Sequence, residues 1–95
     1  MLNQAKLMMK AKKLQKELAN EIIEVEAGDG AVVVQVNGEQ KIKSIKLNEE
    51  LIDFDDLPEL ERWLESAIRE SISRSQQIAA EKMKPLLGSL GGFGG

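Results

Sequence analysis

The sequence predicts one small α+β domain of the order α-β-β-β-α, in which a three-stranded antiparallel meander is flanked by two helices. Apolar residues recur at helical spacing near both ends of the chain, and between residues 21 and 47 they alternate with period two. The 95 residues are 42% apolar, which suffices for one hydrophobic core but not for two.

The first helix is predicted over residues 2–20. Its apolar stripe has the 4-3-4 spacing of one helical face and spans about 60° on a helical wheel: Leu7, Ala11, Leu14 and Leu18. Five lysines spread over roughly 160° of the opposite side. They are Lys6, Lys10, Lys12, Lys13 and Lys16. This helix should therefore rest on the body by its leucines and present its lysines to solvent.

The pattern then changes to that of β-strands. In EIIEVEA (residues 21–27), Ile23, Val25 and Ala27 alternate with glutamates, as in a strand with one buried face. The Gly28-Asp29-Gly30 segment predicts a turn. In AVVVQV (31–36), three valines face one side and Val33 faces the other, which is typical of a central strand.

A hairpin should join this strand to the third. Asn37-Gly38 predicts a two-residue type I′ turn, because that turn needs positive φ at both central residues. KIKSIKL (41–47) is the predicted third strand. Its apolar parity shifts between Ile42 and Ile45, so we expect a β-bulge near Lys43-Ser44.

The second helix is predicted over about 57–83. It follows NEELIDFDDLPELE (48–61), which carries seven acids and no base. Asp56 and Glu59 resemble a capping box, and Pro58 is tolerated in a first turn. The apolar and small residues of its stripe are Leu57, Leu60, Leu64, Ala67, Ile68, Ser71, Ile72, Ser75, Ile78 and Ala79.

Pro85 is expected to end this helix, which gives a single domain over residues 1–84 and a flexible tail over 85–95. Half of the last ten residues are glycine, a composition typical of flexible segments. The chain holds only three aromatic residues, so its core should be thin. We therefore expect dimerisation, which would bury a second apolar face.

The composition excludes several classes of function. Without cysteine there are no disulfides or thiolates, and without histidine the commonest general base and metal ligand are missing. No run approaches the eighteen apolar residues of a membrane span, and the N-terminal lysines precede no signal-peptide core. We expect a cytoplasmic protein that does not bind membranes.

No motif predicts an enzyme. An EF-hand loop counted from Asp53 would place Pro58 where glycine is required and Leu64 where glutamate is required. The acids at 53–56 instead suit a helix N-terminus. The glycines do not lie between a strand and a helix, and the serines of the second helix have no histidine to activate them. We expect no cofactor, metal or small-molecule substrate.

The lysine-rich helix is the strongest functional signal. Residues 1–16 contain five lysines and no acid, although the whole chain has a net charge of −3. Lys6 to Lys16 would span about 15 Å, the length of several phosphates along a duplex. Lysine without neighbouring base-reading side chains favours phosphate contact. Two other interpretations are a solvated helix face and a helix that lies on a membrane surface. Further basic residues could extend the surface: Arg62, Arg69, Arg74, Lys82 and Lys84.

The complete arrangement resembles the YbaB/EbfC family of nucleoid-associated proteins. The shared segments are KLMMKAKKLQKELA, AVVVQVNGEQKIKSIKL, the acidic NEELIDFDDLPELE, the helix ending IAAEKMK and the glycine-rich tail. The resemblance implies a homodimer with helices that project like tweezers and contact double-stranded DNA. Carried onto this chain, it implies DNA contacts by Lys6, Lys10, Lys12, Lys13 and Lys16, and more weakly by Lys82 and Lys84.

The sequence and the resemblance together predict a nucleoid-associated homodimer that holds the DNA backbone with weak sequence preference. One alternative is a protein-interaction scaffold, whose lysines dock on an acidic replication or recombination partner and bind DNA only incidentally. Another is a structural dimer whose charges serve solubility and bind no ligand. A competition experiment distinguishes the first alternative, because a scaffold would keep its protein partner in excess DNA.

Overall fold

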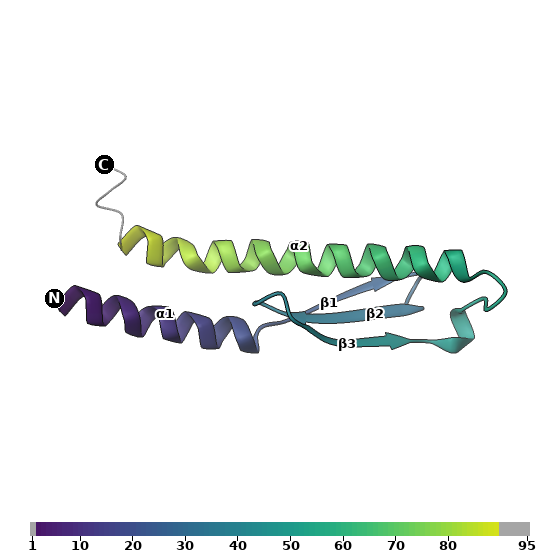
Figure 1. The fold of residues 1–95 in the computed structure, drawn as a ribbon, viewed down its shortest axis with the longest axis horizontal. Helices are drawn as coiled ribbons and strands as arrows, with labels where there is room; N and C mark the ends of the chain where they lie inside the picture. The colour runs from purple at the N-terminus through teal and green to yellow at the C-terminus, as the bar shows by residue number, and fades with distance from the viewer. Residues whose placement is uncertain (1, 90–95) are drawn as a thin grey trace.

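The computed structural model describes residues 2–89 and has the predicted α-β-β-β-α order (Figure 1). Its elements are α1 (Leu2–Asn20), β1 (Ile22–Ala27), β2 (Val32–Asn37), β3 (Ile42–Leu47), the short 3-10 helix η1 (Glu49–Leu51) and α2 (Leu57–Ser89). The molecule is elongated, with extents of 62 × 24 × 15 Å. α2 runs along both the sheet and α1, so the first helix extends from the body as an arm (Figure 1). Within residues 2–89, neither helix has the length and apolarity needed to cross a membrane.

The sheet is an antiparallel meander with β2 in the centre, as predicted. The alternating valines of β2 are fully buried, and together with Ile23 and Val25 of β1 they form the core against Ala67 of α2. The predicted bulge is confirmed in β3. Gln35 pairs with Ser44 whereas Val36 pairs with Ile42, so Lys43 is the additional residue. The bulge explains why the apolar parity of this strand shifts.

α2 covers only part of the sheet. It packs on β1 and β2, whereas among the described elements β3 contacts only β2. The register places Ile42, Ile45 and Leu47 opposite Val36, Val34 and Val32, and therefore on the same face as the core valines. These three β3 side chains remain 43–48% exposed. The structure thus leaves an apolar strip beside α2, which we call the β3 strip.

The predicted type I′ turn at Asn37-Gly38 is wrong. Neither residue has positive φ; Gln40 has it instead, with φ 62°. Gln40 N donates to Asn37 O (3.2 Å) and Asn37 N donates to Lys41 O (2.9 Å), which makes a longer loop. Gly38 serves another purpose, because a Cβ at this position would lie 2.8 Å from the carbonyl oxygen of Leu18 in α1. Contact with α1 therefore determines this turn.

The beginning of α2 agrees with the prediction and its end does not. Glu59 N donates to Asp56 Oδ1 (3.2 Å), so Asp56 caps the helix. The prediction that Pro85 ends the helix is wrong, since α2 continues to Ser89. An interior proline costs about 3 kcal/mol. Pro85 and Leu86 line a groove with Leu14 of α1, and this contact between the helices favours continued helix. Residues 90–95 of the predicted tail lie outside the described part.

Candidate nucleic-acid interface

The arm is a helix because of its residue types. Residues 2–20 contain no glycine, proline or β-branched residue, and straight-chain side chains lose little rotamer freedom in a helix. Leu18 is buried at the base of the arm, and Leu7 and Leu14 are half-buried along it. The five predicted lysines of α1 are all exposed. The expected division into an apolar side and a lysine side is therefore present, although Ala11 of the stripe is exposed.

The space between α1 and α2 gathers four of the predicted lysines. Lys13, Lys16 and Lys82 line one hollow of about 540 Å³ beside Glu17 and Glu21. Lys10 and Lys82 line the adjoining groove of about 280 Å³, which also contains Leu14, Pro85 and Leu86. Lys82 of α2 is thus brought next to the α1 lysines, although 66 residues separate it from Lys16.

The remaining three predicted lysines are distributed differently. Lys6 lies toward the tip of the arm, in a hollow that it lines with Asn3, Leu7 and Lys10. Lys12 and Lys84 are exposed and line none of these hollows. The lysines therefore form a surface that extends around the arm, and they do not converge on one enclosed site.

These positive charges are largely unneutralised by neighbouring side chains. Lys82 pairs with Glu21 (Nζ to Oε2, 3.4 Å), and this half-exposed pair joins the second helix to the base of the arm. Exposed pairs of this type contribute about 0–1 kcal/mol. No ion pair between described residues involves Lys84 or any of the five α1 lysines. The charge of the arm is therefore available to an external anion.

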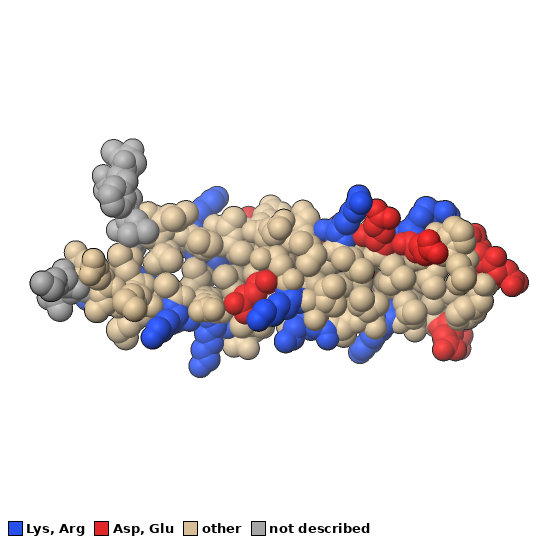
Figure 2. Space-filling model, viewed as in Figure 1, with Lys and Arg blue, Asp and Glu red and all other residues tan. Residues whose placement is uncertain are grey.

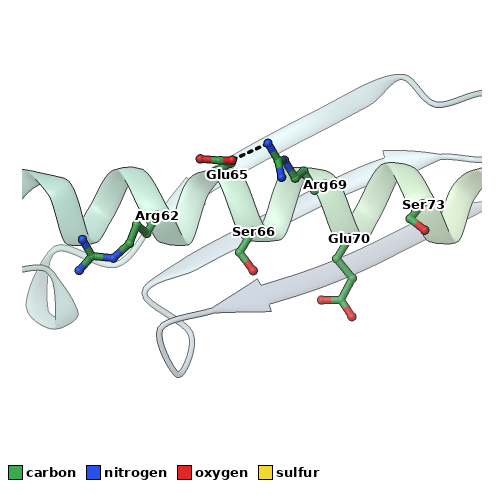
Figure 3. A pocket seen from close by; sticks show the side chains of 6 residues that line it. All are labelled: Arg62, Glu65, Ser66, Arg69, Glu70 and Ser73. Carbon is green, nitrogen blue, oxygen red and sulfur yellow. Dashed lines mark ion pairs between the residues drawn. The ribbon is translucent and has the colours of Figure 1, made fainter.

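The arginines of α2 do not extend this surface. Arg69 pairs with Glu65 (2.6 Å) and Arg74 pairs with Glu70 (2.7 Å), each with the acid one turn earlier. Figure 3 shows the shallow hollow on α2 where Arg62 and Arg69 alternate with Glu65 and Glu70. A face of mixed sign is typical of a solvated helix surface. The interpretation of these arginines as ordinary surface charges is the better one.

The acidic segment of residues 48–61 lies at the other end of the molecule. Figure 2 shows several red side chains at the end where η1 and the beginning of α2 lie, and blue side chains along the arm and also along the body. Among the described residues, no group of three or more acids could hold a metal ion. Asp53 Oδ1 instead accepts from Asp55 N (2.9 Å), and Asp56 caps α2. The acidic segment thus forms turns and a helix start, as the sequence indicated.

Sequence reasoning missed the residues that attach the arm to the body. Ser75 was predicted only as part of the helix stripe, yet its hydroxyl oxygen makes three hydrogen bonds to the β2–β3 turn. Asn37 was predicted only as a turn residue, yet its side chain also donates to Ala19 O in α1. A polar residue within an apolar stripe was the one available signal, because buried hydroxyls require partners.

A helical arm with exposed, unpaired lysines on a small α+β body defines a class of protein suited to holding polyanions. Residues 1–90 match the YbaB/EbfC DNA-binding family, and the chain belongs to this family. The family is described by DNA binding and not by a reaction. The resemblance found in the sequence is therefore confirmed.

Individual relatives agree with this assignment. A nucleoid-associated protein of Chloroflexus aurantiacus is 40% identical, over 97% of this chain and 99% of its own length. A nucleoid-associated protein of Ruminiclostridium cellulolyticum is 34% identical, over the full chain and 84% of its own length. The solved structure of an uncharacterized Helicobacter pylori protein, HP0035, superimposes with a TM-score of 0.80 over 88% of each chain. At 17% identity that structure supports the fold alone.

Proposed function

We propose that this chain is a nucleoid-associated protein that binds double-stranded DNA as a homodimer, with the α1 arm of each subunit on the phosphate backbone. The observation that carries the proposal is the set of five exposed α1 lysines, none of which has an ion-pair partner among residues 2–89. Family membership supports DNA as the polyanion. Names of the relatives support a location at the nucleoid.

Lysine on a helix suits backbone contact better than base reading. An ammonium group is a point charge that attracts phosphate without fixed geometry, whereas base recognition uses paired donors and acceptors. Binding should therefore depend steeply on salt and weakly on sequence. If about six phosphates are neutralised per dimer, log K should fall with log salt at a slope near −5. Lys82 and Lys84 of α2 would add weaker contacts. Lys82 is already paired with Glu21, which reduces its attraction for phosphate.

The net negative charge does not oppose this function, because the charges are separated in space. The acids of residues 48–61 gather at the end of the molecule away from the arm, and the molecule is 62 Å long. Charges in water are screened over about 8 Å at physiological salt. DNA on the arm would therefore experience mainly the charges of α1, where five lysines outnumber the single acid Glu17.

The β3 strip supports the homodimer. Ile42, Ile45 and Leu47 face the core side of the sheet but are not covered by α2. Complete burial of such a side chain stabilises by about 1.5–3 kcal/mol, so a second copy on this strip would gain roughly half of that per residue. A dimer would also bring two arms to one duplex, which raises the effective concentration of the second arm.

Charge reversal with a matched control tests the proposal. Lys10→Glu/Lys13→Glu changes the charge of each chain by −4, and so does the control Arg62→Glu/Arg69→Glu on the outer face of α2. Fluorescence anisotropy with a labelled duplex of about 30 base pairs, roughly three turns, should show loss of binding in the lysine variant only. Equal loss in both variants would indicate a general charge effect and contradict the assignment to α1.

A protein scaffold remains the second candidate, carried by the same unpaired lysines, which would suit an acidic protein equally well. It predicts that the parent protein binds no duplex even at low salt. It also predicts that excess DNA would not displace an acidic replication or recombination partner. The anisotropy measurement on the parent therefore distinguishes the two candidates directly.

A further inference from the structure

The arm ends on the β2–β3 turn. The last carbonyl groups of a helix have no partners within the helix and must be satisfied by other groups. Leu18 O accepts from Gly38 N at 2.8 Å, as well as from Glu21 N at 3.2 Å. Ala19 O accepts from the side-chain amide of Asn37 at 3.3 Å. The turn thus provides the C-terminal cap of α1, at the end of the sheet where the arm departs (Figure 1).

Asn37 serves the turn and the arm with one side chain, which is 2% exposed. Its Oδ1 accepts from Glu39 N (2.9 Å) and Lys41 N (3.1 Å), and these bonds hold the loop. Its Nδ2 donates to Ala19 O. The direction of the arm is therefore coupled to the conformation of the turn.

Ser75 attaches the same turn to α2. This side chain is fully buried, and its Oγ donates to Asn37 O at 2.6 Å. It accepts from Gln40 N (3.2 Å) and from Gln40 Nε2 (3.0 Å). Three elements that lie far apart in the sequence, α1, the turn and α2, are thus joined at one buried point. Hydrogen bonds are directional and apolar contact is not, so this network can define an angle that packing alone leaves free.

We infer that Asn37 and Ser75 are positioning residues that fix the angle of the α1 arm to the body and so place its lysines for DNA. This inference rests on the proposed function. Beyond the junction, α2 is the one described element that the arm contacts, along the groove around Leu14. An arm released at its base would keep every lysine charge, but it would have to be ordered again on each binding event.

The experiment uses two variants and one matched control. Asn37→Asp keeps the oxygen that holds the loop, but at neutral pH it presents no donor to Ala19 O. Ser75→Ala removes the attachment to α2. Ser71→Ala is the control, because Ser71 is also fully buried on α2, one turn earlier, and its hydroxyl donates only within its own helix, to Ile68 O (2.8 Å).

The angle of the arm can be measured directly, because the chain has no cysteine. Spin labels at Gln4→Cys and Gln76→Cys, both exposed positions, report the distance between the arm and α2 by pulsed electron resonance. The labelled copy is diluted into unlabelled protein. We expect Asn37→Asp and Ser75→Ala to broaden the distance distribution, and Ser71→Ala to leave it as in the parent.

DNA binding of the same proteins completes the test. The two junction variants should lose about tenfold in affinity, equivalent to about 1.4 kcal/mol, with unchanged circular dichroism. An unchanged distance distribution in both variants would show that the junction does not hold the arm. Broadened distances with parental affinity would show that the angle does not matter for binding. If the parent itself binds no duplex, the proposed function fails, while the distances still test the junction.

Discussion

Gly28 shows how a single residue determines the packing of the sheet against α2. A Cβ at this position would lie 2.6–2.8 Å from three ring carbons of Trp63, and the residue has φ +63°. Such separations are far inside van der Waals contact, so the ring and the turn would have to move apart. Trp63 packs on the core, and therefore the close approach of this turn also supports the covering of β1 by α2.

Gly28→Ala should destabilise the fold by about 2–4 kcal/mol, from the left-handed backbone and the overlap with the indole ring. Gly30→Ala is the control, since Gly30 also has positive φ (+95°) but, apart from its two chain neighbours, no described residue has an atom within 4 Å of its Cβ position. It should cost only about 1–2 kcal/mol. Urea unfolding followed by Trp63 fluorescence measures both. Equal losses in the two variants would contradict the close packing of Gly28 on the ring.

At the scale of elements, α1 is held at its base and along one groove. Leu18 is buried at the junction, and Leu14 lines the groove with Pro85 and Leu86 of α2. The helices contact each other beyond the sheet, where no strand supports them (Figure 1). The stability of the arm therefore depends on a few apolar contacts and on the hydrogen bonds at the β2–β3 turn.

Leu14→Asp should loosen the arm while the sheet stays folded, because it removes a half-buried leucine and places a carboxylate in the groove. The expected local cost is about 1–3 kcal/mol. Hydrogen exchange should become faster for α1 amides and remain unchanged in β2. Met8→Asp is the control, as Met8 is 62% exposed on the same helix. Parental exchange in the Leu14 variant would refute the assignment of this helix face.

The elements that depend on local pattern were predictable from the sequence. The bounds of α1, the alternation in β1 and β2, the bulge at Lys43 and the Asp56 cap all follow from spacing and side-chain chemistry. The failures occur where distant segments meet. Asn37-Gly38 adopts another turn because of Leu18, and α2 passes Pro85 beside Leu14. Tertiary contacts outweigh local preference at such places.

The candidate site was predictable in part for the same reason. The exposure of the five α1 lysines follows from helical periodicity, and the structure agrees with it. The proximity of Lys82 to Lys13 and Lys16 requires the packing of α2 along α1, which no local pattern reports. The attachment of the arm through Ser75 was likewise hidden, since a serine in a helix stripe has many roles.

At the scale of the whole molecule, the features to explain are the separation of charge and the uncovered β3 strip. Five lysines and one acid, Glu17, lie on α1, whereas residues 48–61 at the far end carry seven acids and no base, so a ligand on the arm meets mainly positive charge. The β3 strip is apolar on the core side of the sheet, next to a helix that covers only β1 and β2. A second copy would complete the core and present a second arm.

Ile45→Asp should prevent dimerisation, because it places a charge in the centre of the β3 strip. Light scattering should then give a mass near 10.5 kDa, in contrast to twice that value for the parent. Lys46→Asp is the control, as Lys46 pairs with Val33 on the opposite face of the same strand. The affinity for DNA should fall in the Ile45 variant, because a monomer presents one α1 arm to the duplex and a dimer presents two. A parent that is monomeric at micromolar concentration would contradict the dimer.

The most direct test of the account is the salt dependence of DNA binding by the parent and by Lys10→Ala. The account predicts a steep slope for the parent, near −5, and a slope shallower by about 2 in the variant, since each dimer loses two lysine–phosphate contacts. Arg69→Ala, which removes a charge already paired with Glu65, should keep the parental slope. Salt-independent binding by the parent, or the same slope in the parent and Lys10→Ala, would contradict the claim that the α1 lysines hold the DNA backbone.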